Sequence, residues 1–155
     1  MRRSHRTVTP QRRLGAAIAS LPQSARAALA VVAAREDLPL VAGSWERDSG
    51  GCLVANVVRS LAVDEPAADG AGPEEQTLDL RILALFPELS SRDLNRLIVA
   101  WDEAAADSGA TGDAALRRLL REALALAAEL DSGDPRRPGG DGGRRAADVA
   151  AAPAR

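Results

Sequence analysis

The sequence contains no lysine and no tyrosine, and it has one cysteine and one histidine among 155 residues. Because Cys52 stands alone, an intramolecular disulfide and a cysteine-based metal cluster are both excluded. The lone histidine, His5, excludes a histidine-rich metal site, and no acidic segment has the spacing of a calcium-binding EF-hand. The sequence therefore predicts no metal centre and no cofactor.

Motifs that carry common catalytic chemistry are also missing. The chain has no phosphate-binding GxxxxGK[ST] loop, no GxGxxG turn, no GxSxG nucleophile elbow and no HExxH zinc motif. A cysteine nucleophile ordinarily needs a nearby base, and the only histidine lies in the basic N-terminal segment. We therefore expect a protein that is not an enzyme and has no catalytic residues.

Aromatic residues are scarce, with only Phe86, Trp45 and Trp101 in the chain. A core must therefore be built from Leu, Val, Ile and Ala, with helices packed closely across small alanine faces. The favoured residues Arg, Ala, Gly, Asp and Pro all have G+C-rich codons. This bias indicates a bacterium of high G+C content and weakens any functional interpretation of individual arginines.

The charge is nearly balanced, at a formal −2, so no overall field points to nucleic acid or to a membrane. Positive charge is nevertheless concentrated at the N-terminus. Five arginines there are candidate phosphate contacts: Arg2, Arg3, Arg6, Arg12 and Arg13. No aromatic side chain is interleaved with them for base stacking, so nucleic acid is an alternative partner rather than the favoured one.

No apolar run approaches the roughly 20 residues of a membrane-spanning helix. We therefore expect no membrane association and a cytoplasmic protein. The alternative is export by a twin-arginine signal, because Arg12 and Arg13 precede the apolar residues 14–21. Pro22 and Arg26 interrupt that apolar stretch, which argues against export.

Apolar residues recur at helical spacing in six segments. The clearest is 113–130, where Leu116, Leu119, Leu120, Ala123, Leu124, Leu126, Ala127 and Leu130 share one side, with Arg117, Arg118, Arg121, Glu122 and Glu129 on the other. The other predicted helices cover 10–21, 25–36, 52–62, 77–86 and 91–106. For 52–62 the β-branched residues leave a short strand as an alternative.

Residues at the ends of these segments match known capping patterns. Thr9 followed by Pro10, Ser24, Thr77, Ser90 and Asp113 are the expected N-caps, and Gly109 and Gly112 separate the last two helices. The fold prediction is an all-α, single-domain bundle of about six helices over residues 10–131. It contains a flexible acidic linker at 64–76, a disordered basic arm at 1–9 and a disordered Gly/Pro/Arg/Ala tail at 132–155.

Two sites are candidates for interaction or reactivity. On a helix over 52–62, Cys52, Asn56 and Arg59 share the face opposite Leu53, Val57 and Leu61, which predicts a small polar pocket with a thiol in the first helical turn. Packing of Cys52 as a small hydrophobic side chain is the alternative. Trp45, in a polar loop, is either a binding anchor or a cover over the end of the core.

These observations favour a non-catalytic bacterial protein-interaction or regulatory module that binds another protein. A homodimer is a further prediction, because Ala-rich amphipathic helices often pair. The alternative is a nucleic-acid-associated regulator that uses the N-terminal arginines, and the remote alternative is a thiol-dependent enzyme or redox sensor at Cys52.

Overall fold

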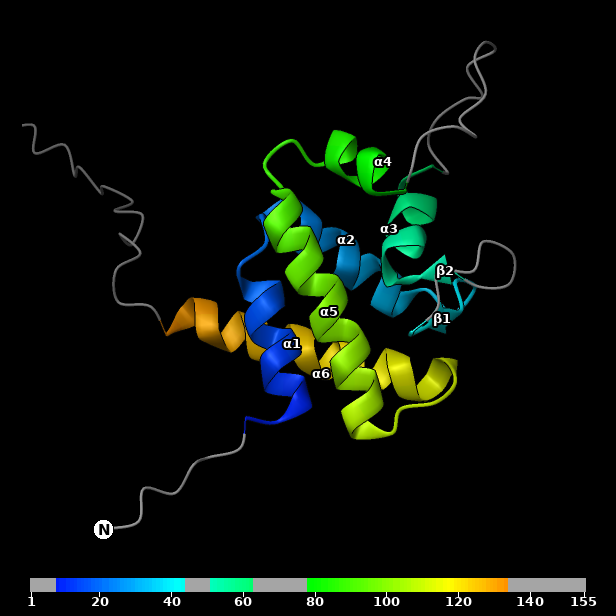
Figure 1. The fold of residues 1–155 in the computed structure, drawn as a ribbon, viewed down its shortest axis with the longest axis vertical. Coiled ribbons are helices and arrows are strands. Elements are labelled where there is room, and N and C mark those ends of the chain that lie inside the picture. The colour runs from blue at the N-terminus through cyan, green and yellow to red at the C-terminus, as the bar shows by residue number, and fades with distance from the viewer. Residues whose placement is uncertain (1–7, 44–50, 63–77, 134–155) are drawn as a thin grey trace, which may run out of the picture.

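The computed structural model describes residues 8–43, 51–62 and 78–133 (Figure 1). Its helices are α1 (Pro10–Ala19), α2 (Gln23–Ala34), α3 (Leu53–Ala62), α4 (Leu78–Leu85), α5 (Ser91–Ser108) and α6 (Asp113–Ser132). Strands β1 (Leu40–Val41) and β2 (Gly51–Cys52) add one short parallel pairing. The predicted all-α fold with six helices is confirmed. The predicted linker at 64–76, most of the arm and most of the tail lie outside the described residues.

Several helix ends follow the expected chemistry. The Thr9 hydroxyl accepts a hydrogen bond from the Arg12 amide, with Pro10 in the first turn of α1. The Ser90 hydroxyl accepts from the Asp93 amide at 3.1 Å, as predicted for α5. Gly109 ends α5 with a φ of +65°, a conformation that glycine adopts without steric cost. These ends are therefore encoded locally.

Three predicted ends are corrected. Pro22, not Ser24, occupies the N-cap position of α2, which begins at Gln23 and makes no side-chain capping bond. Gly112, with a φ of +84°, is the N-cap of α6, so Asp113 is its first helical residue. The segment 52–62 is divided, because Cys52 belongs to β2 and the helix begins at Leu53.

The closest helix packing is that of α1 across α6 and along α5 (Figure 1). Gly15 lies at the crossing with α6, where an added Cβ would come within 3.0 Å of the Leu126 Cβ and 3.1 Å of the Ala123 carbonyl oxygen. Ala123 and Ala127 are buried in the same place. The expected close approach across small side chains therefore occurs at this crossing.

The helices surround one core, to which α1, α2, α3, α5 and α6 each contribute several buried aliphatic side chains. Trp101 is buried in α5, as its register with Leu94 and Leu97 predicts. α3 packs on α2 and carries α4 on its other side (Figure 1). This arrangement leaves α4 at one end of the molecule.

The predicted helix faces are wrong at four positions. Arg117, expected in solvent, is 4% exposed, whereas Leu130, expected in the core, is 53% exposed. The helical spacing of 52–62 and of 77–86 likewise predicts that Leu61 and Leu85 face inward, but both are exposed. The three leucines lie in the last turn of their helices, where fewer neighbouring elements remain to cover them. Arg117 is buried for a different reason, because its guanidinium forms hydrogen bonds with main-chain carbonyls and with Asp113.

The core position of α6 is tested at Leu120, which is fully buried. We expect Leu120→Ala to lower the free energy of unfolding by about 2–5 kcal/mol, because it removes buried methyl groups and leaves a cavity. Leu130→Ala is the matched control and should change it by no more than about 0.5 kcal/mol. Urea denaturation of the two variants measures this. Equal stabilities would contradict the packing of α6.

Candidate functional site

The segment 35–43, which connects α2 to β1 and continues past it, is held mainly by side chains from other elements. Three helices supply them: Asn56 comes from α3, Trp101 and Asp102 from α5, and Asp113 and Arg117 from α6. Each of these side chains bonds a main-chain group of the segment. Buried main-chain groups outside regular structure need such partners, since an unpaired one is costly. The segment is therefore the place where distant parts of the sequence converge.

Arg117 makes the most extensive contacts in this region. Its two terminal nitrogens donate to the Val32 carbonyl at 2.7 Å and to the Leu38 carbonyl at 2.8 Å. The guanidinium also forms a bidentate pair with Asp113, one turn earlier on α6, at 2.7 and 3.3 Å. This side chain therefore supplies the last turn of α2 with a charged donor, in addition to the Arg35 amide that also bonds the Val32 carbonyl.

Arg121 adds a second bond to the same helix end, because its Nε donates to the Ala33 carbonyl at 3.1 Å. Two arginines of α6 thus lie at the C-terminal end of α2, where positive charge also interacts favourably with the helix dipole. These bonds hold the C-terminal end of α2 against α6.

Asp113 connects α6 to the strand pair. Its Oδ1 accepts from the Leu40 amide at 2.8 Å, in addition to its bond from Arg117. Burial raises the pKa of this carboxyl, but the hydrogen bonds from Arg117 and Leu40 outweigh burial and hold the pKa below its ordinary value. The charged form of Asp113 is therefore the one that the fold favours.

Asn56 and Trp101 form hydrogen bonds with the segment 35–43 as well. Asn56 is fully buried and its Nδ2 donates to the Pro39 carbonyl at 2.8 Å. The Trp101 indole nitrogen donates to the Val41 carbonyl at 3.2 Å, and the Asp102 carboxylate accepts from the Gly43 amide at 2.9 Å. The predicted polar face of Cys52, Asn56 and Arg59 is therefore wrong, because Asn56 points into the fold while Arg59 is exposed.

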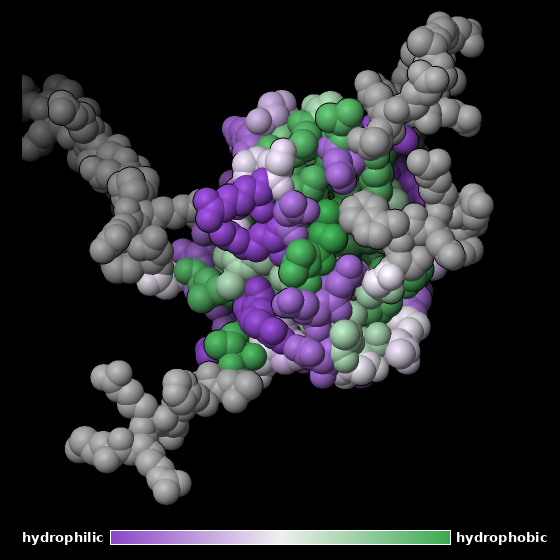
Figure 2. Space-filling view, viewed as in Figure 1, coloured by the Kyte–Doolittle hydropathy of each residue, from purple (hydrophilic) through white to green (hydrophobic). Residues whose placement is uncertain are grey.

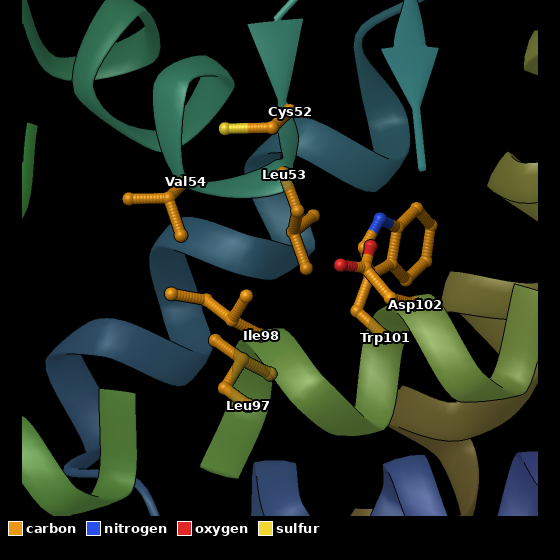
Figure 3. Close-up of a pocket in the computed structure, with 7 residues that line it drawn as sticks. All are labelled: Cys52, Leu53, Val54, Leu97, Ile98, Trp101 and Asp102. Atoms are coloured by element: carbon orange, nitrogen blue, oxygen red, sulfur yellow. The ribbon is translucent and has the colours of Figure 1, made fainter. Parts of the chain in front are cut away.

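Cys52 is half-buried at the edge of a small cavity between α3 and α5 (Figure 3). The cavity measures about 20 Å³, close to the size of one water molecule and far below that of a cofactor site. Its lining is mostly apolar: Cys52, Leu53, Val54, Leu97, Ile98, Trp101 and Asp102. Figure 3 shows the sulfur pointing away from Trp101. These apolar neighbours favour the interpretation of Cys52 as a small hydrophobic side chain that packs against the fold.

The other predicted positions are dispersed. Trp45, Arg2, Arg3 and Arg6 lie outside the described residues. Arg12 is exposed. Arg13 forms ion pairs with Glu103, at 3.6 Å, and with Asp107. The two described arginines among the five candidate phosphate contacts thus differ, because Arg13 is paired with acids of α5 and Arg12 is exposed.

A wider groove of about 670 Å³ runs between the start of α2 and the end of α6. Arg26 of α2 and Asp131 of α6 form an ion pair across it at 2.8 Å. The rest of the lining is small or apolar: Ile18, Gln23, Ala27, Leu124, Ala127, Ala128 and Ser132. Its charges are already paired with each other, so the groove has no evident chemistry.

An apolar surface that the pattern did not predict lies on α4. Leu80 is 58% exposed and Leu85 is 45% exposed, while Ile82 faces the core. Figure 2 shows hydrophobic residues gathered over α4 and along the seam between α5 and α3. The signal is in the sequence 78–85, where only Asp79 and Arg81 are polar, so no single face can hold all the apolar residues.

The chain was also compared with known proteins. No protein-family model, no curated protein and no solved structure matches it. Over the residues that the structure describes, no group of three or more His, Cys, Asp or Glu side chains is placed to hold a metal ion. None of the helices in those same ranges combines the length and apolarity needed to cross a bilayer.

The role of Arg117 is tested by Arg117→Met, which keeps most of the side-chain volume and removes every donor. We expect the free energy of unfolding to fall by roughly 2–5 kcal/mol, because the carbonyls of Val32 and Leu38 and the carboxylate of Asp113 each lose a charged donor. Arg118→Met, on the exposed side of α6, is the matched control, with an expected change within about 0.5 kcal/mol. Equal losses in both variants would contradict the account.

The pH dependence of stability tests Asp113. Because its pKa is lower in the folded chain than its ordinary value of 3.8, its contribution is complete above that pH and is lost as the pH falls through the folded value. Asp113→Asn should therefore unfold with a weaker pH dependence below about pH 4. Arg35 lowers the pKa of Asp37 as well, by a side-chain hydrogen bond, so wild type and variant must be compared directly. Identical pH profiles would rule out this role.

Proposed function

We propose that this chain is a non-catalytic protein-interaction or regulatory module that binds another protein through the outer face of α4. The observation that carries the proposal is the exposure of Leu80 on the side of α4 opposite the buried Ile82. A surface helix normally places polar residues on that side. An apolar patch that remains in solvent is a common mark of a protein contact.

The geometry of α4 supports this assignment. Successive residues of a helix are about 100° apart, so Leu80 and Ala84 project on the side away from Ile82. Both are exposed, as is Leu85 in the last turn, whereas Leu83 is half-buried against the core. Leu61, in the last turn of the neighbouring α3, is also exposed. Exposed leucines thus occur on both of these neighbouring helices.

The chemistry of this surface favours a protein partner over nucleic acid. Phosphate binding needs several cationic side chains directed at the ligand, and α4 has only Arg81. Leucine side chains instead gain free energy from burial against another apolar surface. We therefore assign the partner as a protein with an apolar contact surface.

The two alternatives have no comparable support in the part of the chain that the structure describes. The nucleic-acid regulator requires arginines that contact phosphate, but Arg13 is already paired with two acids of α5. For thiol chemistry, Cys52 borders a mostly apolar cavity of about 20 Å³. Neither observation favours its alternative, so the protein-interaction module is the function that we propose.

A photo-crosslinking amino acid at position 80 tests the proposal in the source cells. We expect it to trap a defined protein partner in stoichiometric yield, because Leu80 lies in the contact. The same amino acid at position 130 is the matched control, since Leu130 is exposed to a similar degree on α6. Leu80→Glu should abolish co-purification of the trapped partner, and Leu130→Glu should not.

The products also separate the alternatives. A crosslink to a second copy of this chain would identify the partner as the homodimer predicted from the sequence. Equal crosslinking from positions 80 and 130, or none from position 80, would contradict the assignment of α4. Recovery of nucleic acid that depends on residues 1–13 and is lost as salt rises would instead support the alternative regulator.

A further inference from the structure

α4 covers an apolar cavity. The cavity measures about 20 Å³ and lies where α2, α3, α4 and α5 meet. Ile82, Phe86 and Leu89 lie on the α4 side of it, and Val54, Val57 and Leu97 lie on the side of the bundle. All six of these side chains are buried. Movement of α4 would therefore uncover an apolar surface on the bundle.

The attachment of α4 to the bundle is small compared with that of other elements. Ile82 is the only buried residue among its eight. Among the described residues, no side chain between positions 78 and 89 forms a hydrogen bond or ion pair with the rest of the fold. The segment 35–43, in contrast, is fastened by five side chains. Apolar contacts are thus the main attachment of α4: Ile82, Phe86 and Leu89 are buried, and Leu78 and Leu83 pack against the core while partly buried.

We infer that α4, together with the turn that ends at Leu89, is a lid that opens while the α1–α5–α6 packing stays intact. Regions with few buried apolar contacts open locally at a lower free energy than the whole domain unfolds. An isolated helix of eight residues is not stable in water, so the opened lid loses its helical hydrogen bonds. This inference goes beyond the proposed function and does not depend on it, because the outer face of α4 is exposed while the lid is closed.

Hydrogen exchange of the full chain tests the lid. Under native conditions the amides of α4 should exchange faster than those of α1 and α6, through an opening that spares those helices. Ile82→Ala should accelerate the α4 amides by roughly thirtyfold or more, because it removes a buried anchor. Leu120→Ala is the control and should accelerate the amides of α1 and α6 with little effect on α4. Equal protection of all three helices, with both variants shifting them together, would overturn the lid.

Thiol labelling separates an opening lid from a helix that only frays in place. In a Cys52→Ser background, Val57→Cys places a thiol under the lid, and Ala17→Cys places one in α1 among buried residues. We expect the thiol at position 57 to react faster than the thiol at position 17, and Ile82→Ala to accelerate only the former. Equally slow labelling at both positions would show that the floor of the cavity stays covered, and the lid would be wrong.

Discussion

The buried guanidinium of Arg117 is the interaction on which this architecture depends. It joins α6 to the last turn of α2 and to the segment after it, at N–O distances of 2.7 and 2.8 Å. A buried charge without a partner is costly, so the fold that places Arg117 there must also bring Asp113 and these carbonyls to it. Asp113 in turn accepts from the Leu40 amide, which positions β1. The same network thus holds β1, which pairs with β2 directly before the start of α3.

The polar network and the apolar surface lie in different parts of the molecule. Side chains from α3, α5 and α6 hold the segment 35–43, whereas α4 is attached mainly by Ile82, Phe86 and Leu89. A rigid bundle with a lightly attached, apolar element suits a module that presents a binding surface.

Local sequence signals predicted much of the fold, because caps and helical spacing act over a few residues. Thr9, Ser90 and Gly109 mark helix ends that the structure confirms. The sequence could not show that Arg117 is buried, since its acceptors on Val32 and Leu38 lie far away in the chain. The pair of Asp113 and Arg117, four residues apart, was the available clue. Asn56 was misplaced for the same reason. Leu85 was misplaced because α4 is almost wholly apolar, so its pattern does not identify its inner face.

Nuclear magnetic resonance of the arginine side chains tests the role of Arg117 most directly. If the account is right, the guanidinium protons of Arg117 give separate, slowly exchanging signals with nuclear Overhauser contacts to the Leu40 amide. The exposed Arg118 serves as the internal reference and should give averaged signals that exchange quickly with water. If Arg117 behaves like Arg118, its guanidinium lies in solvent, and the packing of α2 against α6 described here is wrong.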